Sequence, residues 1–320
     1  MLLNPMGSPK FSVIIITRNR AGFLPKVLDS LLKQDYENAR YEIIVVDNNS
    51  DDDTTSTVQR FKRECPNRIH YVFEPKIGMS KARNTGASVA KGEILVFIDD
   101  DAIASSNWLD NYAYLYKTFP EIVAWGGKID LVFQSCRPEW LSDDLMMALS
   151  YLNISDKETL LSFPDYPFGC NFSVKRECYM NIGGFIEDLK TSNEEKAFFY
   201  KLHLNNYRVG YSPKALVYHQ IPSSRLEKKY LIKRGIKQGV GNIKFDSIFN
   251  PMKGSRFKEE FNQLLFDGLI IIRNALFYRS KFSFAQIYYL CIRCGQILGI
   301  IMRRFAKNEC RSYSQTNEAS

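Results

Sequence analysis

The feature that most constrains the fold is an alternation of strand-like and helix-like stretches over residues 11–101. Residues 13–16 and 43–46 are short runs rich in β-branched side chains, which favour strands. Between them, residues 23–32 repeat apolar side chains at helical spacing, and a second helical stretch at 79–90 leads into an apolar run at 94–98. This order predicts βαβ units with a parallel sheet, so we interpret the region as an α/β nucleotide-binding half.

The pattern is less regular after this half, although strands and helices continue. Residues 122–125 and 128–133 are predicted to be strands, and a loop region containing proline and aspartate follows to about residue 166. The later elements are an apolar segment at 168–174, a helix from Lys175, a helix at 194–205 and a last strand around 216–219.

From about residue 223 the chain becomes basic, and from 261 to 305 it is strongly apolar. A helix that crosses a bilayer needs about 20 nearly uninterrupted apolar residues. Charges such as Arg273 and Arg293 interrupt this region, so we expect amphipathic helices and no spanning helix. Helices of this kind are typical of segments on a membrane surface, but a helical cap packed on a catalytic domain gives the same pattern.

The charge balance and the cysteines narrow the class of protein. The 43 basic and 35 acidic residues give a formal net charge of +8, which attracts phosphates, nucleic acid or an anionic membrane without choosing among them. The seven cysteines lack a repeating spacing, and the N-terminal residues lack the apolar core of a signal peptide. We therefore expect a cytoplasmic protein, and leave open a peripheral contact with the inner face of the cytoplasmic membrane.

Three polar clusters follow three of the predicted strands. They are TRNR at residues 17–20, DNNS at 47–50 and DDD at 99–101. In open α/β sheets ligands bind beyond the carboxyl ends of the strands, where these clusters would meet. A single polar cluster at a strand end is often only a turn, but three at one edge favour a ligand site.

The DDD cluster needs a positive partner. Asp99, Asp100 and Asp101 are adjacent like charges at the end of a buried strand, and their removal from water is costly unless a cation or strong donors compensate. A dinucleotide site would need a G-x-G-x-x-G turn after the first strand, where this chain has TRNRAG at 17–22. Without that glycine cradle a bound diphosphate needs a metal, and carboxylate oxygens suit Mg²⁺ or Mn²⁺.

These segments resemble the inverting glycosyltransferases of family 2, which have the GT-A fold. In that family T-x-N-R follows the first strand, V-V-D-N-x-S-x-D-x-T follows the second, and G-x-x-x-A-R-N-x-G precedes a strand that ends in D-x-D. The chain has the matching segments in this order: TRNR at 17–20, VVDNNSDDDT at 45–54, GMSKARNTG at 78–86 and FIDDD at 97–101. Further matches are NFSVKR at 171–176, GGF at 183–185, NEE at 193–195 and YSPKALVYH at 211–219.

The resemblance covers roughly residues 11–220 and implies an α/β GT-A fold with a mixed central sheet and a C-terminal helical extension. The expected divisions are a tail at 1–10, a GT-A domain at 11–222 with its acceptor half at 102–222, an extension at 223–305 and a flexible tail at 306–320.

The resemblance also implies roles for matching residues. Asp47 would hydrogen-bond the nucleotide base, Arg83 would contact the base or the diphosphate, and Asp99 would hold the ribose side. The expected nucleotide-sugar-binding residues are Thr17, Asn19, Arg20, Asp47, Asn48, Arg83, Asp99 and Asp100. The acceptor side is assigned to Trp125, Gly169 and Asn171, and the Mn²⁺ or Mg²⁺ ligands to Asp101, Asp99 and His219.

An inverting transfer also needs a base for the proton of the acceptor hydroxyl. Glu194 and Glu195 open a predicted helix at the position of the family's acidic pair, and we favour Glu195 as the base, with Glu194 as the alternative. The family more often has Glu followed by Asp here. Acids in the first turn of a helix also stabilise its dipole, and both roles are compatible.

The expected activity is metal-dependent transfer of a sugar from a nucleotide-diphosphate sugar to a hydroxyl of a glycan or lipid-linked acceptor. A nucleotidyltransferase that makes such sugars is an alternative, but it should carry a glycine-rich loop after the first strand, which this chain lacks. A non-catalytic carbohydrate-binding scaffold is a second alternative, and the carboxylates at both the metal and the base positions argue against it. No nucleic-acid partner is expected.

Overall fold

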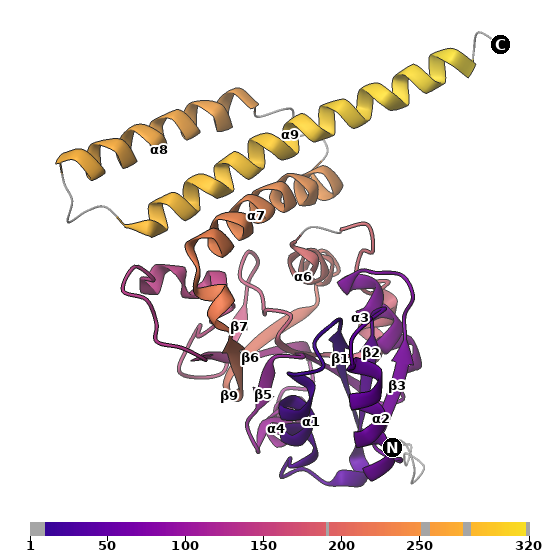
Figure 1. The fold of residues 1–320 in the computed structure, drawn as a ribbon. Helices are drawn as coiled ribbons and strands as arrows, with labels where there is room; N and C mark the ends of the chain where they lie inside the picture. Colours follow the sequence, from indigo (N-terminus) through magenta and orange to yellow (C-terminus); the bar gives the residue numbers. More distant parts are fainter. Residues whose placement is uncertain (1–9, 190–191, 251–256, 278–282, 318–320) are drawn as a thin grey trace. The chain divides into compact units, whose positions relative to one another are not determined.

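The computed structural model describes residues 10–189, 192–250, 257–277 and 283–317, and Figure 1 shows its elements. The chain divides into two compact units. The first consists of Met1–Gln134, Leu149–Lys190 and Glu194–Ile221, and the second of Ser135–Ala148, Thr191–Asn193 and Pro222–Ser320. The main division after Ile221 lies next to the end expected for the α/β domain at residue 222.

The first unit is built on a sheet of nine strands within the described residues, in the order β3-β2-β1-β4-β8-β6-β9-β5, with β7 paired to β9. β1 to β4 pair in parallel, whereas β8 is antiparallel to both β4 and β6, so the sheet is mixed as expected. The strands are β1 (Phe11–Thr17), β2 (Tyr41–Asp47), β3 (Ile69–Phe73), β4 (Ile94–Asp99), β5 (Ala102–Ala104), β6 (Ile122–Phe133), β7 (Thr159–Leu161), β8 (Asn171–Lys175) and β9 (Arg208–Ile221).

Strand β6 differs from the sequence prediction. We expected two strands, at 122–125 and 128–133, and the structure has one continuous strand over both. Its pairing with β9 shifts register between Gly127 and Ile129, so the break in the apolar pattern marks an irregularity within one strand.

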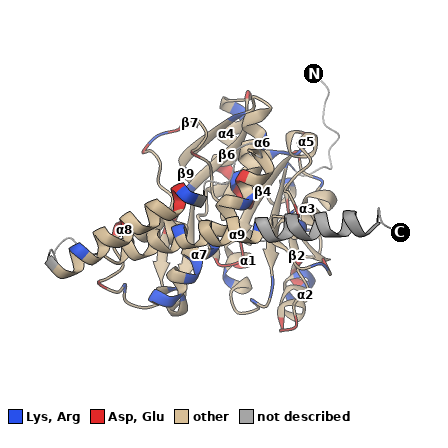
Figure 2. Cartoon of the chain, turned by 90° about the horizontal axis from the view of Figure 1, so that it is seen from above, with Lys and Arg blue, Asp and Glu red and all other residues tan. Residues whose placement is uncertain are grey.

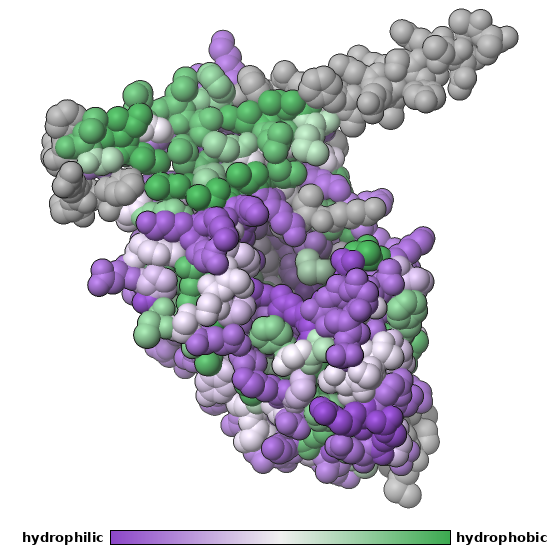
Figure 3. Space-filling view, viewed as in Figure 1, coloured by the Kyte–Doolittle hydropathy of each residue, from purple (hydrophilic) through white to green (hydrophobic). Residues whose placement is uncertain are grey.

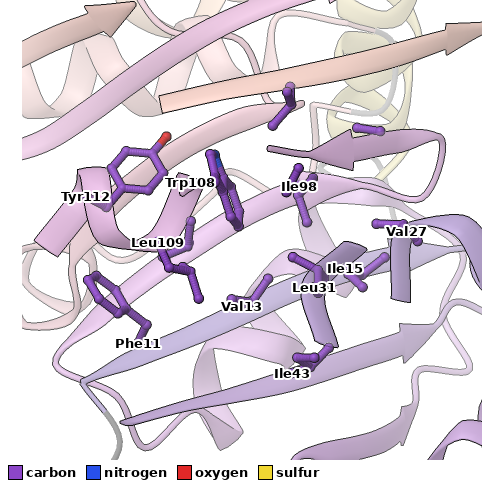
Figure 4. Close-up of a cluster of buried hydrophobic side chains, with 14 of the residues drawn as sticks. Phe11, Val13, Ile15, Val27, Leu31, Ile43, Ile98, Trp108, Leu109 and Tyr112 are labelled. Atoms are coloured by element: carbon purple, nitrogen blue, oxygen red, sulfur yellow. The ribbon is translucent and has the colours of Figure 1, made fainter. Parts of the chain in front are cut away.

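Helices cover both faces of the sheet. Because successive side chains of a strand point to opposite faces, Phe11, Val13 and Ile15 of β1 enter one core and Ile14 enters the other. Figure 4 shows part of the first core, where Trp108 and Leu109 lie above the strands. Helices α1 (Leu24–Leu32), α2 (Thr54–Glu64) and α4 (Trp108–Thr118) contribute to this core, and α3 (Met79–Val89), α5 (Arg176–Asn181) and α6 (Glu194–Leu204) to the other.

The second unit contains three long helices, as expected for the basic and apolar extension. They are α7 (Lys228–Phe249), α8 (Phe257–Phe277) and α9 (Phe284–Asn317). Single-turn 3-10 helices η1 (Asn38–Arg40) and η3 (Ser223–Leu226) and the longer η2 (Asp143–Leu149) connect other elements.

Two expectations for this extension were wrong. The flexible tail expected from residue 306 is helical to Asn317, because α9 continues without a break. We also expected no helix apolar enough to span a membrane, but Phe284–Arg303 meets that criterion by length and composition. The charges that interrupt the apolar region cluster before residue 284, and Arg293 is the only charged residue inside 284–302.

Glycines allow α7 and α9 to approach closely. Each helix carries a G-x-x-x-G pair, Gly235 with Gly239 in α7 and Gly295 with Gly299 in α9. A Cβ atom on Gly239 would collide with the carbonyl oxygen of Ile292 and would lie 2.8 Å from Cα of Gly295. The two backbones therefore touch where side chains would otherwise keep them apart.

Gly239→Ala is expected to lower the free energy of unfolding by about 1–3 kcal/mol, because the added methyl group forces the two helices apart. Gly268→Ala is the control, since a Cβ atom on that glycine of α8 meets nothing within 4 Å. The control should raise stability by about 0.5–1 kcal/mol. Denaturant unfolding of both full-length variants measures the difference, and equal stabilities would contradict this account of the packing.

Candidate active site

The polar clusters expected at one edge of the sheet come together there. β1 pairs with β2 so that Thr17 lies beside Asp47, and β4 lies on the other side of β1 and ends at Asp99. The segments that follow these strands therefore start at the same edge, at the carboxyl ends of parallel strands. β9 adds His219, which the antiparallel pairing with β5 brings level with the end of the acidic cluster.

Arg20 is a counter-charge of the acidic cluster. Its Nη1 atom lies 2.6 Å from Oδ2 of Asp101 and 3.6 Å from Oδ1 of Asp100. The binding of the nucleotide sugar by Arg20 stays a prediction; its guanidinium is held at this edge by the two carboxylates. Neighbouring carboxylates repel one another and are stabilised by a positive side chain nearby. The charge-assisted hydrogen bond between Arg20 and Asp101 is short and therefore strong.

His219 links Asp101 to the backbone. Its Nδ1 atom lies 3.0 Å from the carbonyl oxygen of Leu149, and its Nε2 atom lies 3.1 Å from Oδ1 of Asp101. A carbonyl oxygen can only accept, so Nδ1 donates and the Nε2 atom of a neutral ring turns its lone pair toward the carboxylate. Two acceptors at this distance require a proton or a metal cation between them. This donor set therefore fits a divalent metal.

The acidic cluster carries more negative charge than its neighbours neutralise. Burial raises the pKa of Asp100 to about 7; Arg20 acts against this rise and Asp101 adds to it. Burial also raises the pKa of Asp99, against the lowering effect of Arg83. An additional cation at this edge would lower both pKa values and stabilise the ionised carboxylates.

Arg83 connects the acidic cluster to the predicted base. It projects from α3 and is almost completely buried, with Nη1 2.9 Å from Oε1 of Glu195 and Nη2 3.7 Å from Oδ1 of Asp99. Its guanidinium also lies over the ring of Phe185, 5.1 Å from the ring centre. Of the two acids that open α6, Glu195 therefore faces the polar edge and keeps 21% of its side chain exposed, whereas Glu194 is buried.

Gly169 lies against this ion pair, and its assignment to the acceptor side stays a prediction. A Cβ atom on Gly169 would collide with Oε1 of Glu195 and with Nη2 of Arg83. The backbone thus runs directly beside the two charged groups, and only a residue without a side chain fits here.

Gly169→Ala is expected to lower turnover roughly 10- to 100-fold, because it displaces Glu195 and Arg83. Donor affinity should fall less, since the contact between Asp101 and His219 involves neither of these side chains. Gly22→Ala serves as the control, since a Cβ atom there meets nothing within 4 Å. Steady-state kinetics and a donor-binding titration on both variants check the result. Unchanged turnover of the Gly169 variant would show that a side chain at position 169 does not disturb Glu195 and Arg83.

The carboxylate of Asp47 is held by hydrogen bonds. Its side chain is completely buried; Oδ1 accepts from the backbone N–H of Ser50 at 2.9 Å. Oδ2 accepts from the hydroxyl groups of Thr55 and Tyr71 at 3.0 and 2.9 Å. These three hydrogen bonds fix the orientation of the carboxylate, and the contact of Asp47 with a nucleotide base stays a prediction. Thr55 lies just beyond the recognised segment, and nothing in the sequence pointed to Tyr71.

Asn48 and Asn19 also form hydrogen bonds that hold the loops at this edge of the sheet in place. The Asn48 amide donates to the carbonyl oxygens of Glu74 and Lys76, and its Oδ1 accepts from Gly78; its contact with the donor stays a prediction. Asn19 adopts a left-handed backbone with φ of 55°, and its Oδ1 accepts from the N–H of Asp51. Thr17 is buried at the end of β1.

Trp125 and Asn171 belong to the core, which corrects their assignment to the acceptor side. Trp125 is 1% exposed and lies 5.6 Å from Phe119, ring centre to ring centre. Asn171 is completely buried. Its Oδ1 accepts from Trp108 and Tyr112, and its Nδ2 donates to two backbone carbonyls, so its hydrogen-bonding capacity is used. These side chains point between the sheet and α4, because strand alternation turns them away from the edge.

The three predicted metal ligands are only partly assembled. Within the described ranges, no three His, Cys, Asp or Glu side chains are grouped as a ready set of metal ligands. Asp101 and His219 are in contact, while Asp99 instead lies near Arg83. The carbonyl of Leu149, which orients His219, is a backbone group that no sequence signal could have revealed.

The chain is similar to known glycosyltransferases. Residues 12–183 match the family described as "Glycosyl transferase family 2". The glucosyl-dolichyl phosphate glucuronosyltransferase of Haloferax volcanii is 23% identical over 249 residues, which cover 75% of this chain and 78% of that protein. The succinoglycan biosynthesis protein ExoM of Rhizobium meliloti is 28% identical over 206 residues, covering 63% of this chain and 64% of that protein, so the chain spans slightly less than two thirds of that relative.

Solved structures share the fold. The mannosyltransferase PcManGT from Pyrobaculum calidifontis, in complex with GDP-Man and Mn²⁺, aligns with a TM-score of 0.61 at 20% identity, covering 92% of this chain and 88% of its own. S. aureus TarS 1-349 in complex with UDP-GlcNAc aligns with a TM-score of 0.55 at 20% identity, covering 90% of each chain. Since the family match extends over more than half of the sequence, the chain belongs to glycosyl transferase family 2 and is a glycosyltransferase with the GT-A fold.

Proposed function

We propose that this enzyme transfers a sugar, with inversion, from a nucleotide-diphosphate sugar to a hydroxyl group of a glycan or lipid-linked acceptor, with Mn²⁺ or Mg²⁺ as cofactor. The observation that carries the proposal is the contact between Oδ1 of Asp101 and Nε2 of His219, 3.1 Å apart at the edge where the polar loops meet. A carboxylate and an imidazole at this distance, beside two further carboxylates, are groups of the kind that hold a divalent cation, and the cation would in turn bind an anionic ligand.

The donor is proposed to lie along this edge. Thr17 ends β1 and Asn19 and Arg20 follow it. Asp99 ends β4 and Asp100 follows it, so a diphosphate there would be near both segments. PcManGT is described with GDP-Man and TarS with UDP-GlcNAc, which supports a nucleotide sugar as the class of donor. Asp47 and Asn48 also hold the loops around the pocket.

Asp101 and His219 would hold the metal, with Asp99 as the third ligand. When bound, the metal neutralises the charge that develops on the departing nucleoside diphosphate. Arg20 pairs with Asp101 at 2.6 Å and would remain beside the diphosphate as a fixed positive charge. These residues would thus bind and orient the leaving group.

Glu195 is proposed as the base. It lies in the first turn of α6, and Arg83 fixes its Oε1 atom at 2.9 Å while its other oxygen remains for the acceptor hydroxyl. Proton transfer from that hydroxyl to Glu195 generates the nucleophile, which attacks the anomeric carbon from the side opposite the diphosphate. Gly169 lets the backbone pass directly beside this carboxylate and Arg83, because a Cβ atom there would collide with both.

A panel of nucleotide sugars, screened by thermal shift with Mn²⁺ and with a chelator, tests the proposal. The true donor should raise the melting temperature only with the metal. Incubation with that donor should then release a nucleoside diphosphate slowly through hydrolysis. Release of pyrophosphate from a nucleoside triphosphate and a sugar phosphate would indicate a nucleotidyltransferase instead. Binding of sugars without any turnover would indicate a carbohydrate-binding scaffold.

A further inference from the structure

Helix α8 of the second unit exposes a stripe of large apolar side chains. Leu265, Leu269, Ile272 and Leu276 recur at spacings of four, three and four residues, so they lie on one face of the helix. They are exposed by 53%, 66%, 56% and 67%. Figure 3 shows hydrophobic side chains gathered over α8 and the neighbouring part of α9.

The polar side of α8 faces another helix. Arg293 of α9 lies 2.9 Å from Oε2 of Glu260 and 3.5 Å from Oδ2 of Asp267, both on α8. Only 13% of the Glu260 side chain is exposed. Glu260 and Asp267 are therefore turned toward α9 and the stripe is turned outward, while Lys258, Glu259 and Arg273 are exposed. An apolar stripe that faces outward is the reverse of the arrangement that water favours. A hydrocarbon surrounding favours this orientation, because ionisable side chains there face a partner helix.

Helix α9 extends the apolar surface. Its segment Phe284–Arg303 is long and apolar enough to cross a membrane, and only 33% of the best window is buried inside the structure. Tyr289, Leu298 and Met302 are among its exposed side chains. Arg293, the single charged residue between Phe284 and Met302, is paired with α8 as described above. An exposed apolar surface spread over two helices is characteristic of an interaction site.

Helix α7 carries a row of positive charges in the same unit. Lys229, Lys233 and Lys237 are exposed and recur every four residues, so they share one face of the helix. Lys and Arg are blue in Figure 2. Lysines at this spacing attract anionic lipid headgroups, each contributing about 1 kcal/mol near a charged surface.

We propose that the second unit binds the surface of an anionic lipid bilayer, with the α8 stripe and the exposed side of α9 in the acyl region and the α7 lysines at the headgroup phosphates. The inward ion pairs of Arg293 and the lysine row favour lipid over a second copy of this chain. A second copy would bring another basic surface from a chain with a formal net charge of +8. The proposal concerns the second unit alone and does not depend on the identity of the donor or acceptor.

Sedimentation of the full-length protein with vesicles tests the proposal, with neutral phosphatidylcholine compared with phosphatidylcholine containing phosphatidylglycerol. The wild type should bind the anionic vesicles. Leu269→Glu should weaken that binding at least tenfold, on the order expected for losing one buried leucine and adding a charge. Gln263→Glu adds the same charge at an exposed polar position of the same helix, away from the stripe, and should bind nearly as well as the wild type. Equal binding of Leu269→Glu and the wild type would overturn the proposal.

A second variant tests the charge contribution. Lys233→Gln combined with Lys237→Gln should weaken binding to anionic vesicles on the order of tenfold and leave binding to neutral vesicles unchanged. Melting curves confirm that each variant is folded, since all changed side chains are exposed. Light scattering tests the alternative occupant of the apolar surface, which is a second copy of this chain. A wild-type dimer that Leu269→Glu converts to a monomer, without vesicle binding by either protein, would overturn the proposal in favour of an interface between copies.

Discussion

Replacing Glu195 by Gln is expected to lower turnover by about 10²–10⁴-fold, the usual contribution of a positioned base. The amide keeps the size of the side chain and an oxygen for Arg83, which now lies 2.9 Å from Oε1, but it cannot accept the proton of the acceptor hydroxyl. Donor and metal binding should be nearly unchanged, because the contacts of Asp101 with Arg20 and His219 do not involve Glu195. Turnover and donor affinity measured on one sample check this expectation.

Glu194→Gln is the matched control, because Glu194 is the neighbouring acid of the same helix turn but is buried. It should keep most of the activity if Glu195 is the base. A large loss of turnover in the Glu194 variant, together with normal turnover in the Glu195 variant, would assign the role of base to Glu194. If Glu195 only stabilises the helix dipole, its variant should lose about 0.3–1 kcal/mol of stability and little activity.

Asp101→Asn is expected to weaken metal-dependent donor binding by more than about 100-fold, because loss of a direct ligand should exceed the 10- to 100-fold effect of an outer contact. The change removes the charge from the carboxylate that contacts both His219 and Arg20. Asp100 remains 3.6 Å from Arg20 as a counter-charge, so we expect the fold to survive. Calorimetric titration of the donor with Mn²⁺ and with a chelator measures the effect.

The control for this variant is Asp29→Asn, which removes the same charge from an exposed position on α1. It should bind donor and metal like the wild type. Equal donor affinities for Asp101→Asn and the wild type in Mn²⁺ would exclude Asp101 as a metal ligand. A loss of affinity that is the same with and without the metal would instead indicate that Asp101 acts by holding Arg20.

Much of the fold follows from local patterns. The run at 13–16 became β1 and the apolar run at 94–98 became β4, because a β-branched or apolar run of strand length can be buried on both faces only in a covered sheet. The helix expected at 79–90 became α3. The prediction was least accurate for the extension. Charges before residue 284 led us to expect no spanning helix, whereas the apolar segment of α9 has the length and composition of one.

The sequence predicted the location of the site in the fold, but it predicted the contacts of individual side chains less well. Register between parallel strands brings Thr17 and Asp47 side by side, as the order of the strands implied. Whether a side chain at that edge is free depends on neighbours from distant segments, and Asp47 is occupied by Thr55 and Tyr71. Trp125 was misplaced for a related reason, since its burial depends on how β6 packs under a helix.

The sequence by itself determined the parallel start of the sheet, the acidic cluster at its edge and the family, because strand period, strand order and motif spacing are properties of the chain alone. Only the tertiary structure decided which charges meet. Arg83 pairs with Glu195, Arg20 with Asp101, and Arg293 with Glu260, although other partners of opposite charge lie nearer to each along the chain. Ion pairing acts over a few ångströms, so packing in three dimensions, and not distance along the chain, selects the partner.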